Sequence, residues 1–216
     1  MIAKEQGQIV VLNGVPRSGK TSIARVIQET FPDVWMNLGV DFHIKCTPPA
    51  FRPGVGLRPQ TPEWARATPG RVGLEVLEEH VPLLYAALYE SVAAHARLGL
   101  NVVMDVGHHD AYSKPRSILP DCARRLSGLP VLFIGVRCPV EVIWARREAT
   151  WSQVRGELDE GVVGSVELSQ HAVHSHGKYD LEVDTSVLSP EACAGLIRQR
   201  LEEGPPGTCF AEIRGA

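Results

Sequence analysis

The residues most suited to chemistry lie in one short stretch near the amino terminus. Residues 14 to 21 read GVPRSGKT and match the pattern GxxxxGK[ST] of a phosphate-binding loop. The glycines let backbone N–H groups approach a phosphate closely, while Lys20 supplies a mobile positive charge and the Thr21 hydroxyl is a ligand for Mg²⁺. The pattern therefore predicts binding of ATP or GTP with Mg²⁺. The predicted phosphate-binding residues are Gly14, Val15, Pro16, Arg17, Ser18, Gly19, Lys20, Thr21 and Ser22.

Two aspartates give the next chemical signal, because each closes a short apolar run. Asp41 ends LGVD, and Asp105 ends VVMD. In a parallel sheet the carboxyl ends of the strands share one edge with the phosphate loop, so we expect both carboxylates to face the nucleotide. One would hold Mg²⁺, directly or through water, and the other would accept the proton of an attacking hydroxyl. Each aspartate is also a candidate for capping the helix that follows it.

Arginines in the second half of the chain are candidates for neutralising a transferring phosphoryl group. Arg146, Arg147 and Arg155 surround a polar segment, and Arg137 ends the strand that precedes them. A phosphoryl donor needs positive charge on the transferring group and protection from water. The cluster therefore predicts a lid over residues 147–163, although a solvated surface role stays open for each arginine.

Histidines form two groups. His171, His174 and His176 share one segment, and His108 and His109 follow the VVMD run. Their spacing does not predict a metal site, because His176 lies off the helix face of the other two and no acidic residue completes a ligand set. A substrate-facing role and a structural role both stay open for His174.

Strands and helices that alternate along the chain must position these residues. Apolar runs predict buried strands at 8–14, 34–41, 100–107, 130–138 and 179–186. Helical periods predict helices at 20–31, 71–99, 114–128, 139–151, 165–177 and 189–203, and Pro82 interrupts or kinks the second. Prolines and glycines between residues 47 and 70 predict a long irregular loop, and the order of the tail from 204 stays open. The alternation predicts an α/β, P-loop NTPase-type, doubly wound parallel sheet of about five strands, with helices on both faces.

Composition narrows the class of protein. The 216 residues are 44% hydrophobic and 22% charged, which predicts one domain, and the net charge of −3 predicts no nucleic-acid partner. Five scattered cysteines without a CxxC pair favour reduced thiols over a disulfide framework. Neither a signal-peptide core nor an apolar stretch able to span a membrane is evident. We therefore expect a cytoplasmic protein that acts on a small molecule, and the pattern leaves its oligomeric state open.

Five segments, taken in order, resemble the chloramphenicol phosphotransferase family of P-loop kinases, which phosphorylate an antibiotic hydroxyl with ATP. They are IVVLNGVPRSGKTSIARVIQ, WMNLGVDFHI, NVVMDVG, VLFIGVRCPVEVIWARRE and QHAVHSHGKYDLEVDTS, and they span residues 8 to 186. The resemblance implies that Asp41 is the general base on the acceptor hydroxyl. It also implies that Arg147 belongs to the lid and that Gln170 and His174 lie near the site. The predicted substrate contacts are His43, His108, Gln170 and His174.

The leading hypothesis is an ATP- or GTP-dependent O-phosphotransferase acting on an antibiotic or related natural product, hence a resistance factor. In it Lys20 holds the β- and γ-phosphates, Thr21 and Asp105 hold Mg²⁺, and Asp41 deprotonates the acceptor. A metabolic nucleoside or sugar kinase would use the same residues. A third hypothesis, a nucleotide-dependent switch or assembly ATPase, lacks support from a guanine-reading NKxD motif.

Overall fold

The computed structural model describes residues 6–52, 72–109, 112, 114–151, 166 and 169–215. Its sheet has five parallel strands in the order β2-β3-β1-β4-β5. The strands are β1 (Ile9–Asn13), β2 (Trp35–Asn37), β3 (Asn101–Val106), β4 (Val131–Arg137) and β5 (Leu181–Asp184). β1 reads IVVLN and is buried along its whole length, as expected of a central parallel strand that is covered on both faces. The predicted five-stranded parallel sheet is confirmed.

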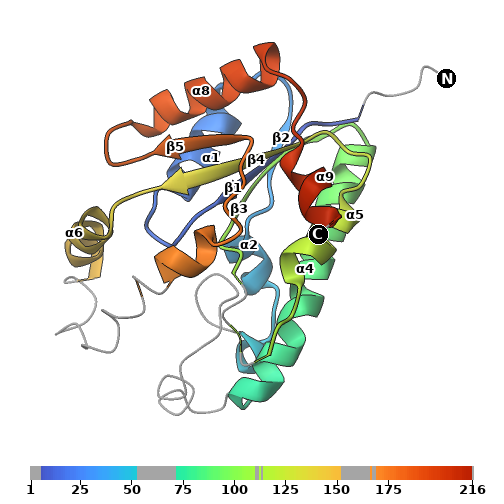
Figure 1. The fold of residues 1–216 in the computed structure, drawn as a ribbon, viewed down its shortest axis with the longest axis vertical. Helices are drawn as coiled ribbons and strands as arrows, with labels where there is room; N and C mark the ends of the chain where they lie inside the picture. Colours follow the sequence, from blue (N-terminus) through green and yellow to red (C-terminus); the bar gives the residue numbers. More distant parts are fainter. Residues whose placement is uncertain are drawn as a thin grey trace.

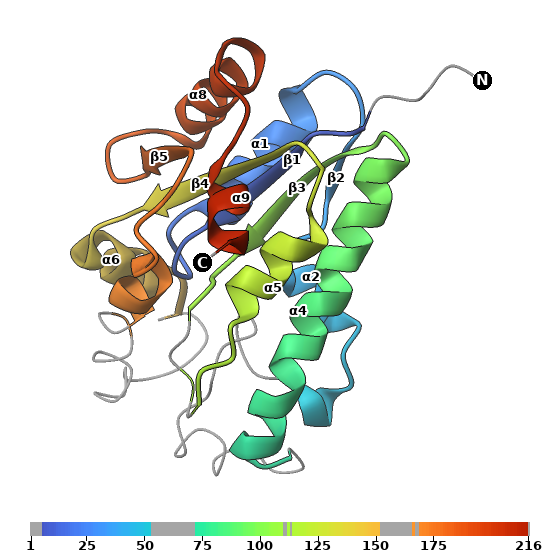
Figure 2. The ribbon, with the colours of Figure 1, turned by 45° about the vertical axis from the view of Figure 1, so that its right-hand side comes forward.

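Helices cover both faces of this sheet, as predicted (Figure 1). The helices are α1 (Lys20–Thr30), α2 (Val40–Lys45), α4 (Leu74–Arg97), α5 (Ile118–Arg125), α6 (Val140–Trp151), α8 (Pro190–Glu203) and α9 (Cys209–Arg214). Residues 169–174 are also helical, and Pro49–Phe51 form a 3₁₀ turn. Figure 2 shows α4, α5 and α9 on one face, whereas α1 and α8 lie on the other. Each layer has its own apolar core against the sheet. Among the described residues, no helix has both the length and the apolar character to cross a membrane.

The first crossover sets the position of the phosphate loop. α1 buries Ile23, Ala24 and Ile27 against the sheet, at the three- and four-residue spacing that makes one helix face. β1 lies in the middle of the sheet, with β3 on one side and β4 on the other. The chain leaves β1 toward α1 at the carboxyl edge, where the direction of winding changes. This is where ligands bind in open α/β sheets.

Several predicted boundaries need correction. The strand expected over residues 34–41 ends at Asn37, because β2 is an edge strand that pairs with β3 alone. Asp41 therefore does not end a strand but lies in the first turn of α2. Asp105 lies inside β3, one residue before its end. The helix expected from residue 114 begins only at Ile118, because Ser117 adopts a left-handed conformation with φ 49°.

The other differences concern α4 and the chain end. α4 is one continuous helix with Pro82 inside it, so the interruption expected as one of two outcomes does not occur, and the alternative, a kink, stays a prediction. The tail forms α9, and the Asp180 carboxylate accepts from the backbone N–H groups of Thr208 and Cys209 at its start. Most of the predicted long loop, all of its residues from 53 to 70, lies outside the described residues. The same holds for Arg155 and for residues 152–163 of the predicted lid.

Candidate active site

The loop between β1 and α1 has the geometry that its motif predicts. The Gly14 N–H donates to the Val106 carbonyl at 3.2 Å, which fixes the start of the loop to β3. Gly19 has a φ of 94°, a left-handed conformation in which a glycine is unstrained. Lys20 is buried, and its Nζ donates to the carbonyls of Gly14 at 2.8 Å and Val15 at 2.7 Å. No described side chain caps the amino terminus of α1, which therefore offers backbone N–H groups to an anion.

Thr21 and Asp105 meet at the base of this loop. The Thr21 hydroxyl donates to Asp105 Oδ2 at 2.8 Å, across 84 residues of sequence. Asp105 is only 7% exposed. A hydroxyl and a carboxylate are hard oxygen ligands of the kind that Mg²⁺ takes beside phosphate oxygens. The two residues predicted to hold the metal are thus neighbours, and their chemistry fits it.

The amino terminus of α2 lies directly against Asp105. A Cβ on Gly39 would come within 1.6 Å of Asp105 Oδ1, so any side chain here would displace the Asp105 carboxylate. The N–H groups of Phe42 and His43 donate to the Gly39 carbonyl and begin the helix. Asp41, two residues after Gly39, lies in the first turn of this helix and is exposed. The site therefore brings Asp41 to the strand edge that carries Asp105, through a helix rather than through a strand end.

Arg146 braces the phosphate loop from outside. Its guanidinium donates to the carbonyl of Thr185 at 2.6 Å, to the hydroxyl of Thr185 at 3.0 Å and to the carbonyl of Arg17 at 3.2 Å. The Thr185 hydroxyl donates in turn to the Ser18 carbonyl at 2.7 Å. Arg17 has a φ of 67°, which is uncommon for a residue with a side chain. The brace holds the loop in this strained form.

The Arg147 side chain makes different contacts from that of Arg146. It is 7% exposed, and its guanidinium lies 5.3 Å from the centroid of the Trp144 ring. Burial lowers the pKa of Arg147, and the nearby charge of Arg17 lowers it further. Two like charges are thus held close together beside the phosphate loop, an arrangement that an anion would stabilise.

Asn13 connects the end of β1 to two histidine-bearing segments. Its Oδ1 accepts from the backbone N–H of His108 at 2.8 Å, and its Nδ2 donates to Tyr179 Oη at 2.8 Å. His108 is buried, with its Nε2 2.7 Å from Tyr89 Oη and its ring stacked on Tyr85. Burial lowers the pKa of His108 to about 3, so the imidazole is neutral near pH 7.

The remaining predicted residues are either partly exposed or already hydrogen-bonded or ion-paired within the protein. His43 is partly exposed on α2, and burial lowers its pKa. Gln170 donates from Nε2 to the Cys138 carbonyl at 3.0 Å. Arg137 forms an ion pair with Glu182 at 2.8 Å. Substrate contacts by His43, His108 and Gln170 stay predictions.

Three residues that matter to this geometry were not singled out in the sequence: Asn13, Thr185 and Tyr179. Asn13 is the one polar residue in the buried run IVVLN, which is a readable signal for a hydrogen-bonding role. Thr185 lies just after the last strand, where ligand contacts collect in this kind of sheet. Tyr179 had no signal of its own, because its partners are distant in sequence.

Comparison with known families identifies the chain. A family model described as chloramphenicol phosphotransferase-like protein matches residues 7–202. The chain therefore belongs to this family, which confirms the resemblance. It is also 28% identical over 218 residues to a Mycobacterium tuberculosis protein named "Putative O-phosphotransferase", with 99% of this chain and 91% of that protein aligned.

Solved structures support the fold. The tunicamycin resistance protein of Deinococcus radiodurans superposes with a TM-score of 0.61 at 18% identity, covering 91% of this chain and 96% of that one. Shikimate kinase from Acinetobacter baumannii gives 0.56 at 14% identity, covering 92% and 95%. At identities this low, the structural similarity shows the fold alone, which is that of P-loop kinases. Family and fold together indicate a P-loop phosphotransferase.

Proposed function

We propose that this member of the chloramphenicol phosphotransferase-like family transfers the γ-phosphoryl group of ATP or GTP to a hydroxyl of an antibiotic or related natural product. The observation that carries the proposal is the arrangement around Asp105. The Thr21 hydroxyl bonds to one carboxylate oxygen, and the start of α2, which carries Asp41, packs against the other. This arrangement supports the proposal of a metal-binding pair and a base on one edge of the sheet.

Each residue has a distinct task in this reaction. Lys20 and the loop N–H groups hold the β- and γ-phosphates, and Thr21 with Asp105 would hold Mg²⁺. When bound, Mg²⁺ supplies charge neutralisation on the phosphate oxygens. Arg147, poised beside Arg17, neutralises the charge that develops on the transferring group.

The acceptor reacts at its hydroxyl oxygen. A bond forms between that oxygen and Pγ while the bond from Pγ to the β–γ bridging oxygen breaks, which releases ADP or GDP. Asp41 takes the hydroxyl proton, and its exposed position on α2 makes it accessible to an incoming molecule. The acceptor pocket is proposed to lie between α2 and the residues that follow β3, with His43 on its wall. Because the donor is an intracellular nucleotide, the proposed reaction takes place in the cytoplasm.

The test is a screen of purified protein with Mg²⁺, ATP or GTP and two groups of acceptors, beside a control with buffer alone. The first group is hydroxyl-bearing antibiotics including chloramphenicol and tunicamycin, and the second is metabolites including shikimate, sugars and nucleosides. ADP release is compared with the phosphorylated acceptor seen by mass spectrometry. The proposal predicts phosphorylation of an antibiotic or natural product.

Two results would contradict it. Turnover confined to ordinary metabolites would replace the resistance role with that of a metabolic kinase. Release of inorganic phosphate alone, with every acceptor tried, would support a nucleotide-hydrolysing switch or machine instead.

A further inference from the structure

The hydrogen bonds around Tyr179 determine which nitrogen of His174 carries the proton. Asn13 Oδ1 accepts from a backbone N–H, so its Nδ2 is the atom that faces Tyr179 Oη and donates to it. The Tyr179 O–H then donates to His174 Nδ1 at 2.6 Å rather than to the Val173 carbonyl at 3.5 Å, because the longer distance is outside the normal range of an O–H···O bond. Nδ1 is therefore the acceptor of a neutral ring. The ring proton of His174 lies on Nε2.

This Nε2–H is a buried donor that the described residues do not satisfy. His174 is 8% exposed, and its Nε2 has no hydrogen-bond partner among the described residues. A buried donor without an acceptor destabilises the folded protein, and almost all such groups in proteins find a partner. A ligand that places an oxygen there would gain affinity from an imidazole whose orientation is already fixed.

The backbone around His174 lies beside the phosphate loop. Val173 packs in one cluster with Val15 of the loop, and its carbonyl accepts from Asn13 Nδ2 at 3.1 Å. Burial is the main cause that lowers the pKa of His174 to about 4. The positive charges of Arg137 and, more weakly, Lys20 act in the same direction. The residue next to His174 thus packs against the start of the phosphate loop and the end of β1.

We propose that His174 is a further phosphate-binding residue of this site, whose Nε2–H donates to an oxygen of the bound nucleotide's phosphate chain. Tyr179 and Asn13 are positioning residues, because they fix the tautomer without touching the nucleotide. The inference rests on the nucleotide site of the proposed function. It does not depend on which acceptor is phosphorylated.

The test compares two amides at position 174. In His174→Gln the amide reaches the place of Nε2 and keeps a donor there, whereas in His174→Asn it reaches only the place of Nδ1. Calorimetry with AMPPNP and with ADP should show affinity about tenfold to hundredfold weaker for His174→Asn, the range of a hydrogen bond to a charged group, and substantial recovery for His174→Gln. Adenosine, which lacks phosphates, should bind all variants alike.

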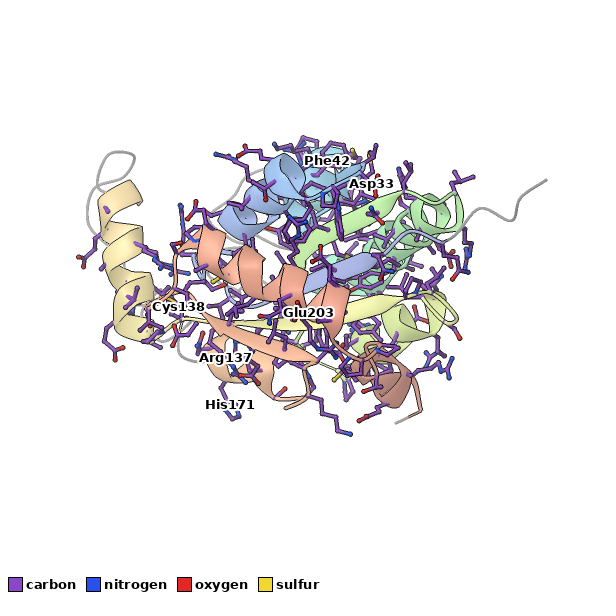
Figure 3. The ribbon with its side chains drawn as sticks, turned by 90° about the horizontal axis from the view of Figure 1, so that it is seen from above. Asp33, Phe42, Arg137, Cys138, His171 and Glu203 are labelled. Carbon is purple, nitrogen blue, oxygen red and sulfur yellow. The ribbon has the colours of Figure 1, made fainter. Side chains whose placement is uncertain are left out.

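His171→Asn is the matched control. His171 lies on the same helical segment but is exposed and points away from the sheet (Figure 3). AMPPNP binding by this variant should equal that of the unaltered chain. Equal affinity of His174→Asn and His171→Asn for AMPPNP would overturn the proposal, as would an equal loss for adenosine. Failure of the acceptor screen with this affinity pattern intact would refute the proposed reaction alone.

A spectroscopic readout tests the tautomer directly. ¹⁵N-detected histidine spectra should show His174 with an unprotonated Nδ1 and a protonated Nε2, and the Nε2 resonance should shift when AMPPNP binds. Tyr179→Phe removes the donor to Nδ1 and should mix the two tautomers. A protonated Nδ1 in the unaltered chain would contradict the assignment.

Discussion

On the donor side of the candidate site, side chains are held by hydrogen bonds to the loop or to one another, whereas on the acceptor side a short helix presents exposed side chains. Lys20, Thr21 and Asp105 are linked to the loop or to each other at 2.7 to 2.8 Å. α2, by contrast, exposes Asp41 and Phe42, the latter with 60% of its surface accessible (Figure 3). The donor side is built for one ligand class, and the acceptor side is where members of a fold can change substrate.

Removing the charge at the centre of the donor side should have the largest effect. Lys20→Ala deletes the ammonium proposed to bind the β- and γ-phosphates, so we expect kcat to fall by about 10²–10³-fold. Steady-state kinetics with the acceptor found in the screen measures it. Lys45→Ala, an exposed lysine on α2, is the control and should keep kcat within about twofold. Unchanged turnover in Lys20→Ala would show that the loop does not hold the donor.

Changing the proposed metal-binding pair should produce a smaller loss, which added Mg²⁺ relieves. Asp105→Asn keeps an acceptor for the Thr21 hydroxyl but removes the negative charge, so we expect activity to fall about 100-fold and the Mg²⁺ concentration for half-maximal rate to rise. Asp121→Asn, at a half-buried aspartate on α5 that pairs with Arg124 and Arg125, is the control. An identical Mg²⁺ dependence in Asp105→Asn and the unaltered chain would remove Asp105 from the metal site.

The pH dependence of folding stability tests the burial of His108 in the loop after β3. Its pKa is about 3 in the folded chain against an ordinary value of 6.5, so the unfolded chain binds the proton first. His108 therefore stabilises the fold above pH 6.5, and this contribution is lost as the pH falls toward 3. By pH 5 the loss is about 2 kcal/mol, or roughly 30-fold in the folding equilibrium.

Urea unfolding at pH 7 and pH 5 measures this effect. His108→Asn should be less stable at pH 7 but should lose less stability between the two pH values than the unaltered chain. His171→Asn, at an exposed histidine, should keep the full pH dependence. The same pH dependence in His108→Asn would show that another group accounts for it.

Weakening the hydrogen bonds of Arg146 to the phosphate loop should give a smaller effect than the changes at Lys20, Asp105 and His108. Arg146→Lys removes the fork that reaches Thr185 and Arg17 together, so nucleotide affinity should weaken about tenfold while kcat at saturation changes little. Arg137→Lys, at an arginine paired with Glu182, is the control. A fall in kcat without a change in affinity would place Arg146 in transfer rather than in support.

The same contrast explains what could be predicted from sequence. The loop motif and the alternation of apolar runs are local patterns, so the sheet, its helices and residues 14–21 were predictable. The start of α2 was not, because the contact that requires Gly39 comes from Asp105, 66 residues away. The same reason hid Asn13 and Tyr179, whose hydrogen bond joins the first strand to a residue next to the last strand.

One measurement tests the central claim most directly: phosphoryl transfer and nucleotide affinity for Asp41→Asn beside Asp33→Asn. Asp33 is exposed in the turn between α1 and β2, with a φ of 67° that asparagine also tolerates (Figure 3). We predict that Asp41→Asn reduces transfer to the acceptor by about 10²–10⁴-fold while AMPPNP binds nearly as before, and that Asp33→Asn changes neither. Transfer retained in Asp41→Asn would contradict the account.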